Sequence, residues 1–259
     1  YTYLEALSAW APSPNATGPS DAANYHPLDG IQLIDVVLHG NYALNVSQPA
    51  GTADYVAKFL NTRGTMIDNM ESYANNGPGF WFDTQNSNMT VKNSYFHDNK
   101  NISGTTSTGR GLNLEANWGP VLIQNNVFSN NARMGLGITA SQGITMRNNL
   151  IAGSPRCMEL TNDLSRVALF PLKNISLKGT VCKGWTDFAG LMTIGGAPAF
   201  TTPSQMGIMA DSTTYDPPSS SSIYAWWENK SIGAAYSVSD EQNKFGWETH
   251  GKKAAVTWP

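Results

Sequence analysis

The sequence predicts an all-β fold, a right-handed parallel β-helix with coils of roughly 22–24 residues and an irregular C-terminal tail. The first observation is a repeat, in which segments with one pattern begin at Val56, Gly79, Gly111, Gly135 and Cys157. Each segment reads as a short strand of alternating apolar and polar residues, a turn, a second short strand and an Asn-rich corner. The second observation is that no helical 3.6-residue pattern separates these strands, which indicates a solenoid of stacked strands.

Asparagine at the corners is the third observation. Asn pairs recur at related places of the repeat, at residues 75–76, 125–126, 130–131 and 148–149. Asn readily adopts left-handed backbone angles, and its side-chain amide can bond the Asn of the next coil. A β-sandwich of hairpins is the competing fold, but it needs two-residue Asn-Gly or Asp-Gly turns, which are largely absent.

We expect three regions along the 259 residues of the chain. Residues 1–30 are rich in Ala, Pro and Ser and show no coil pattern, so they should form an irregular segment. Residues 31–200 should form the β-helix, and residues 201–259 a C-terminal tail that packs on it. Because the chain begins at Tyr1 rather than Met, we expect a processed or truncated form.

The composition narrows the class of function. Apolar residues make up 41% and charged residues 14%, which excludes a disordered chain. The net charge of −3 offers no basic surface for nucleic acid, and no apolar run approaches the ~18 residues of a membrane span. Abundant uncharged polar residues together with 8 Trp are typical of secreted proteins that bind sugars. Glycosylation sequons also favour an extracellular location, and they lie at Asn15, Asn45, Asn88, Asn101, Asn174 and Asn229.

Strand alternation assigns the faces of the first strand in each coil. Its apolar residues should point into the coil and stack there, namely Phe80, Phe82, Leu112, Leu114, Leu136, Ile138, Met158 and Leu160. The residues between them should point outward and form two columns along the solenoid. The first column is Lys58, Trp81, Asn113, Gly137 and Glu159, and the second is Leu60, Asp83, Glu115, Thr139 and Thr161.

Asp83 and Glu115 are neighbours in the second column, on strands about 4.8 Å apart. Like charges directly opposite each other destabilise a sheet, so a purely structural role disfavours this pair. The two carboxyl groups of retaining glycosidases lie roughly 5–5.5 Å apart, which fits adjacent coils. The pair therefore predicts a two-carboxylate catalytic site, and two solvated carboxylates splayed apart are the alternative.

Six residues near the pair are candidates for binding a sugar substrate: Lys58, Trp81, Arg110, Asn113, Trp118 and Glu159. Trp81 and Trp118 could each stack on a sugar ring, although a shielded surface Trp is the alternative. Lys58 and Glu159 flank the carboxylate pair and could contact the substrate. The alternative is that each is an ordinary solvated surface charge. Residues 101–110 form an insertion between the two acid-bearing coils and could line one wall of the cleft.

The sequence resembles a known group of enzymes at these residues. GFWFDT from Gly79 and GLNLEANWGPVLIQNN from Gly111 are similar to the paired motifs of β-helix glycosidases in the pectin-lyase-like superfamily, particularly the β-xylosidases. The resemblance implies that Asp83 is the nucleophile and Glu115 the acid/base, with no cofactor and no metal. It covers roughly residues 50–185. Family members usually carry further N-terminal coils, and this chain is similar to the C-terminal part of such a protein.

Two other functions stay open. A polysaccharide lyase would use Lys58 or Arg110 as the base, and Asp83, Glu115 and Glu159 could hold calcium. The acidic balance and an expected shortage of outward Arg argue against a polyuronate substrate. A non-catalytic carbohydrate-binding β-helix would need the aromatic residues but no carboxylate pair.

Two further expectations concern the stability and association of the chain. Cys157 and Cys182 are 25 residues apart, close to one coil, so a disulfide between neighbouring coils is expected in an oxidising compartment. The apolar strand Ile31–Val37 lies near the start of the solenoid. An open solenoid end exposes strand edges, so we expect a partner chain or a second copy to contact this strand.

Overall fold

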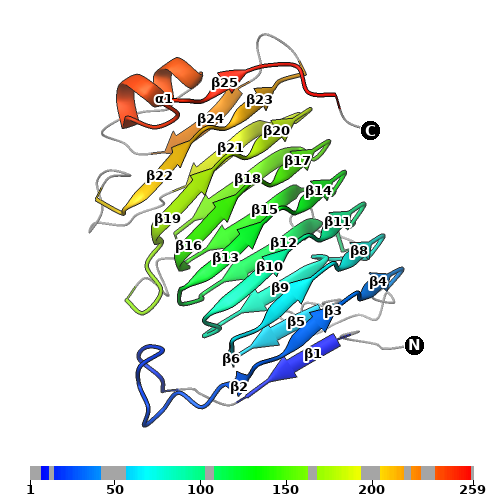
Figure 1. Ribbon diagram of the computed structural model, residues 1–259, viewed down its shortest axis with the longest axis vertical. Helices are drawn as coiled ribbons and strands as arrows, with labels where there is room; N and C mark the ends of the chain where they lie inside the picture. The colour runs from blue at the N-terminus through cyan, green and yellow to red at the C-terminus, as the bar shows by residue number, and fades with distance from the viewer. Residues whose placement is uncertain are drawn as a thin grey trace.

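The computed structural model describes residues 7–11, 15–41, 57–102, 108–162, 168–193, 205–218, 223–228 and 237–257. These residues form a solenoid in which the strands of successive coils stack on one another (Figure 1). The strands fall into three long sheets, here called sheets 1, 2 and 3, and neighbouring strands within each are parallel. Each coil contributes strands to sheets 1, 2 and 3 in that order.

The three sheets contain most of the strands. Sheet 1 consists of β1 (Leu7–Trp10), β5 (Ala57–Leu60), β9 (Phe80–Asp83), β12 (Arg110–Glu115), β15 (Met134–Thr139), β18 (Arg156–Thr161), β21 (Phe188–Thr193) and β24 (Ile223–Glu228). Sheet 2 consists of β3 (Gln32–Ile34), β7 (Met66–Asp68), β10 (Met89–Lys92), β13 (Val121–Gln124), β16 (Gln142–Arg147), β19 (Lys173–Lys178) and β22 (Ile208–Asp211). Sheet 3 consists of β4 (Val37–His39), β8 (Glu71–Tyr73), β11 (Tyr95–His97), β14 (Val127–Ser129), β17 (Leu150–Ala152), β20 (Val181–Lys183), β23 (Thr214–Asp216) and β25 (Lys252–Lys253). A small separate sheet pairs β2 (Leu28–Asp29) with β6 (Thr62–Arg63).

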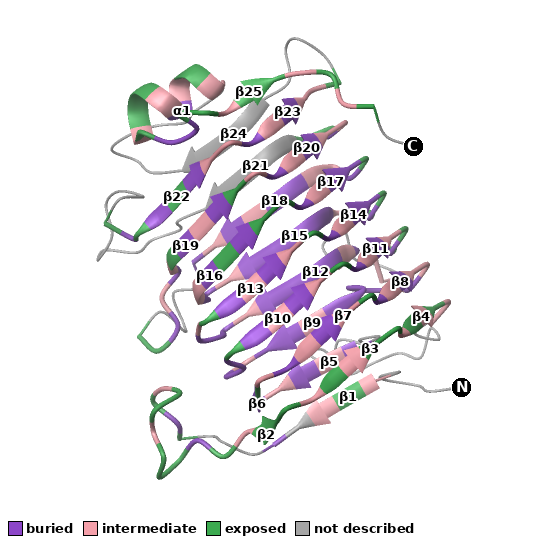
Figure 2. Cartoon of the chain, viewed as in Figure 1, coloured by how far each residue is buried: buried purple, intermediate pink, exposed green. Residues whose placement is uncertain are grey.

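The register of sheet 1 confirms the predicted stacking of the interior. Phe82 pairs with Leu114, Leu114 with Ile138, and Ile138 with Leu160. None of the four side chains is more than 2% exposed. Figure 2 shows the buried residues running through the middle coils, with more exposed residues in the first coil. The inward-facing apolar residues of these strands therefore form one continuous core.

The Asn-rich corners have the two functions that the sequence predicts. In three of the four pairs the first residue is left-handed, as at Asn125 and Asn148, where φ is 55°. The second residue is buried and bonds the next coil: the Asn126 side-chain amide donates to Asn149 Oδ1 over 3.1 Å. A second ladder runs through another corner, where Asn99 Nδ2 donates to Asn131 Oδ1 over 2.9 Å. The corners thus bend the chain at a left-handed residue, which is Asn at 125, 130 and 148 but Ala74 and Asp98 before Asn75 and Asn99, and they join coils through the buried Asn that follows.

The coils extend beyond the expected boundaries of 31 and 200. β1 lies within the segment expected to be irregular, yet it pairs with β5 of the second coil. Four strands beyond residue 200 also belong to the sheets, because β22, β23 and β24 pair with β19, β20 and β21, and β25 pairs with β23. Helix α1 (Val238–Phe245) leaves the coil pattern and lies at the end of the solenoid (Figure 1).

Cys157 and Cys182 form the predicted disulfide, with a Cα–Cα distance of 6.0 Å. The expected location between neighbouring coils is wrong, because β18, β19 and β20 are the three consecutive strands of a single coil. Both cysteines are buried in the core, each 1% exposed. The bond therefore closes one coil on itself across the corner between sheets 3 and 1.

Candidate active site

The two predicted carboxylates lie side by side on the outer face of sheet 1. Asp83 ends β9 and Glu115 ends β12, and the two residues are direct partners in the parallel register. Their inward neighbours Phe82 and Leu114 are fully buried, so alternation directs both carboxylates outward. Asp83 is only 7% exposed, whereas Glu115 is half-buried. The predicted adjacency is confirmed, and it places two acids one strand spacing apart, about 4.8 Å.

Lys58 of β5 joins Asp83 to Trp81. Its Nζ atom lies 2.8 Å from Asp83 Oδ2 and 4.5 Å from the centre of the Trp81 ring. The Thr84 hydroxyl donates a hydrogen bond to Asp83 Oδ1 over 2.8 Å. Both carboxylate oxygens of Asp83 therefore have a partner, and the side chain is held in one orientation. The sequence placed Lys58 and Trp81 beside the pair, and the structure brings them into contact.

Arg110 and Asn113 occupy the outer face next to Glu115. Arg110 Nη1 donates to Asn113 Oδ1. A Cβ atom at Gly137 would lie 3.0 Å from Arg110 Nη1 and 2.8 Å from Asn113 Oδ1, so the glycine leaves the space that Arg110 fills. Burial lowers the pKa of the Arg110 guanidinium, while the negative charges of Glu159 and Glu115 act in the opposite direction. Arg110 thus lies within electrostatic range of one member of the carboxylate pair.

Glu159 lies in a group of arginines rather than in solvent. Its Oε2 atom accepts from Arg156 Nη1 over 2.8 Å and from Arg133 Nη2 over 3.3 Å. The expected shortage of outward Arg is therefore wrong, because Arg110, Arg133 and Arg156 all act on this carboxylate. The sequence could have predicted this group, since the three arginines recur every 23 residues, which is one coil.

Trp118 is not the exposed sugar-stacking residue that the sequence suggested. It is 2% exposed, and its ring stacks on Phe170 at a centroid distance of 5.1 Å, with Tyr25 packed edge-on at 5.3 Å. Its Nε1 atom donates to the Leu169 carbonyl over 3.3 Å. Segments distant in sequence therefore cover the ring, which leaves little of it exposed for stacking on a sugar.

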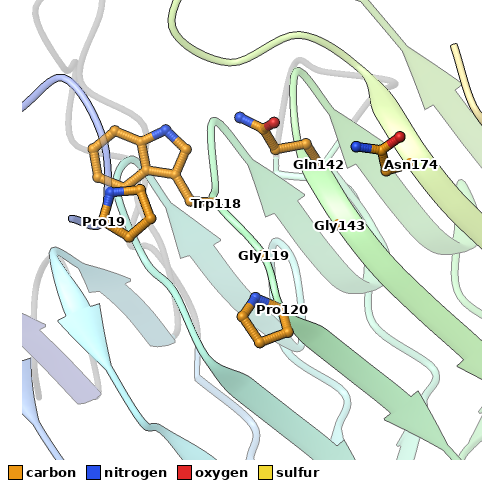
Figure 3. A pocket seen from close by; sticks show the side chains of 7 residues that line it. All are labelled: Pro19, Trp118, Gly119, Pro120, Gln142, Gly143 and Asn174. Carbon is orange, nitrogen blue, oxygen red and sulfur yellow. The ribbon is translucent and has the colours of Figure 1, made fainter.

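A hollow of about 370 Å³ opens beside this tryptophan, at the corner between sheets 1 and 2. Its lining is uncharged, and Figure 3 shows how the side chains surround it. The lining residues are Pro19, Trp118, Gly119, Pro120, Gln142, Gly143 and Asn174. Neither Asp83 nor Glu115 is among them, so the hollow and the carboxylate pair are separate features.

Comparison with known proteins identifies the fold. Residues 24–151 match the family model described as right handed beta helix region. The chain forms a right-handed parallel β-helix, as predicted. No curated protein and no solved structure matches the chain significantly.

Among the described residues, no helix is long and apolar enough to cross a membrane. No group of three or more His, Cys, Asp or Glu side chains in the same part of the chain is arranged to hold a metal ion.

Proposed function

We propose that the protein is a secreted, retaining glycoside hydrolase, with Asp83 as nucleophile and Glu115 as acid/base. The supporting observation is the direct register between these two residues on adjacent parallel strands. Side chains that leave adjacent strands in direct register can bring their carboxyl groups to the roughly 5–5.5 Å of retaining enzymes, a shorter separation than inverting enzymes use. The Cys157–Cys182 disulfide is compatible with an extracellular location.

The reaction would proceed in two steps. Asp83 attacks the anomeric carbon while Glu115 protonates the leaving oxygen, giving a covalent glycosyl-enzyme. Glu115 then removes a proton from water, which hydrolyses the ester and restores both carboxyl groups. Lys58 and Thr84 orient Asp83 for attack, since each contacts one of its oxygens. Trp81, Asn113, Arg110 and Glu159 line the same face as candidate sugar contacts.

Kinetics with a panel of aryl glycosides and oligosaccharides test this proposal. Asp83→Asn should lower kcat by about 10³-fold or more, because an amide cannot form the ester. Glu115→Gln should slow substrates with poor leaving groups far more than activated aryl glycosides, which need no proton. Asp68→Asn is the matched control, because Asp68 also pairs with a lysine of an adjacent strand, Lys92 at 3.0 Å, but lies on sheet 2 and outside the candidate site. If both active-site variants cleave at the parent rate, the proposal fails and a carbohydrate-binding role replaces it.

A polysaccharide lyase is the second candidate, and the arginines of sheet 1 favour it. Lys58, Arg110, Arg133 and Arg156 give this face four cations, which suit an acidic polysaccharide. A lyase would eliminate across the sugar ring and leave an unsaturated product that absorbs in the ultraviolet. A hydrolase leaves saturated products and a new reducing end, so the absorbance of the products distinguishes the two reactions.

A further inference from the structure

The outward column that contains the carboxylate pair continues over β15 and β18 of sheet 1. Glu115 pairs with Thr139 of β15, and Thr139 pairs with Thr161 of β18. Both threonines are half-buried, and the residues before them, Ile138 and Leu160, are 0% and 2% exposed. Alternation therefore directs the two hydroxyl groups to the same outer face as Glu115.

These two hydroxyl groups are suited to hydrogen-bonding an uncharged polar ligand. The Thr161 hydroxyl donates to Glu159 Oε1 over 3.3 Å, so its oxygen is left to accept a hydrogen bond from a ligand. Among the described residues, the Thr139 hydroxyl has no hydrogen-bond partner. Glu159 is itself held by Arg156 at 2.8 Å and Arg133 at 3.3 Å, so its charge is balanced within the chain. This part of the face therefore offers hydroxyl groups to a ligand.

Bulky side chains limit the face at both ends of its strands. At the strand starts, Arg110 and Arg156 are the first residues of β12 and β18. At the strand ends, a buried cluster covers the corner, and it consists of Ala16, Tyr25, Ala116, Trp118, Ala140 and Phe170. Between these limits β12 has two outward residues, Asn113 and Glu115, which are about 7 Å apart along the strand. The face therefore continues past the carboxylate pair across the strands, along the solenoid axis, rather than along them.

The proposed reaction gives the substrate a direction on this face. The nucleophile bonds to the anomeric carbon of the sugar that is retained, and the acid/base protonates the oxygen of the group that leaves. Asp83 lies on β9 and Glu115 on the next strand of the sheet, β12. The retained sugar therefore lies over β9, against Trp81 and Lys58, and the leaving group continues past Glu115 over β15 and β18.

We propose that Thr139 and Thr161 are specificity-determining residues that bind a sugar as the leaving group. This rests on the glycosidase function proposed above and names its class of substrate, which is glycosides with a second sugar, rather than an apolar aglycone, on the leaving side. The hydroxyl groups of a sugar satisfy both threonines, whereas an apolar aglycone would cover them and leave them without partners. The substrate extends along the solenoid axis, with its reducing end toward β18.

Kinetics on two substrates that share one retained sugar test this assignment. For the sugar that the panel of glycosides identifies, the para-nitrophenyl glycoside has an aromatic leaving group and the corresponding disaccharide has a sugar leaving group. Thr139→Val together with Thr161→Val removes both hydroxyl groups at nearly constant volume. This variant should lower the ratio of kcat/KM for the disaccharide to kcat/KM for the para-nitrophenyl glycoside by about tenfold, because two hydrogen bonds are lost. Each valine change alone should lower the ratio by about threefold, so the test does not depend on the double variant.

Three control variants separate this role from a structural one. Thr139→Ser together with Thr161→Ser keeps the hydroxyl groups and should keep the parent ratio. Trp81→Ala should lower kcat/KM for both substrates alike, because Trp81 lies against the sugar that they share. Thr145→Val removes an exposed hydroxyl on sheet 2 and should leave both values unchanged.

The outcomes distinguish this assignment from the function on which it rests. An unchanged ratio in the valine variants, an equal fall in Thr145→Val, or a Trp81→Ala effect confined to the disaccharide would overturn the assignment while the glycosidase function stands. A parent protein that cleaves none of the glycosides in the panel would overturn the glycosidase function, and the assignment with it.

Discussion

At the scale of single residues, buried asparagines join neighbouring coils through hydrogen bonds. Asn126 is 1% exposed, and its side-chain amide donates to the Val91 carbonyl over 2.9 Å and to Asn149 over 3.1 Å. Its Oδ1 atom accepts from the Ser94 amide over 3.0 Å. One side chain therefore satisfies polar groups in both neighbouring coils, away from water.

Adjacent asparagines should respond differently to substitution. We predict that Asn126→Ala lowers the free energy of unfolding by about 2–4 kcal/mol, because it leaves several buried groups without partners. Asn125→Gly should change it by less than ~0.5 kcal/mol, because Asn125 is exposed and glycine adopts the same left-handed conformation. Urea unfolding of the two variants measures the difference. Equal losses would contradict the assignment of separate functions to the two residues.

The residues of the candidate site could be predicted only in part. Asp83 and Glu115 follow from the two-residue period of a strand and the coil repeat, which together set their register. The burial of Trp118 did not follow, because Tyr25 and Phe170 cover it from segments far away in sequence. Local alternation assigns faces within strands, but it does not show what covers a corner.

At the scale of elements, helix α1 closes the core with buried acids. The Tyr215 hydroxyl of β23 lies 3.2 Å from Glu241 Oε2 of the helix and 3.1 Å from Glu248 Oε1. The Thr213 amide donates to Glu248 Oε2 over 2.9 Å. Burial, with the charges of Glu248 and Asp240, raises the pKa of Glu241 to about 8, and burial also raises the pKa of Glu248. The cap therefore binds a proton near neutral pH that the unfolded chain would release.

This buried proton predicts that stability falls as pH rises. The raised pKa of Glu241 stabilises the folded state fully below the ordinary value of 4.5, and the contribution is lost as pH rises to about 8. The free energy of unfolding should fall across this range with a slope approaching ~1.4 kcal/mol per pH unit for one proton. Glu241→Gln should reduce the slope, while Asp240→Asn should keep the slope but end the pH range slightly lower, because the Asp240 charge helps to raise the pKa of Glu241. An unchanged slope in Glu241→Gln would show that other groups bind the proton.

For the whole molecule, the fold class followed from the sequence but the ends of the solenoid did not. The middle coils are regular, and Leu114 to Ile138 to Leu160 spans 24 and then 22 residues. From Leu160 the next intervals, to Met192 and Trp227, lengthen to 32 and 35 residues. The longer connections between strands make the repeat irregular in the sequence, although the strands still stack. The sequence therefore predicted an irregular tail beyond residue 200.

A crystal structure of the Glu115→Gln variant with a bound oligosaccharide tests the central claim, that the carboxylates of sheet 1 are catalytic, most directly. The account predicts a sugar against Trp81, with its anomeric carbon about 3–3.5 Å from an oxygen of Asp83 and its glycosidic oxygen beside residue 115. A sugar bound only in the hollow next to Trp118, with Asp83 and Lys58 still paired and out of its reach, would contradict it.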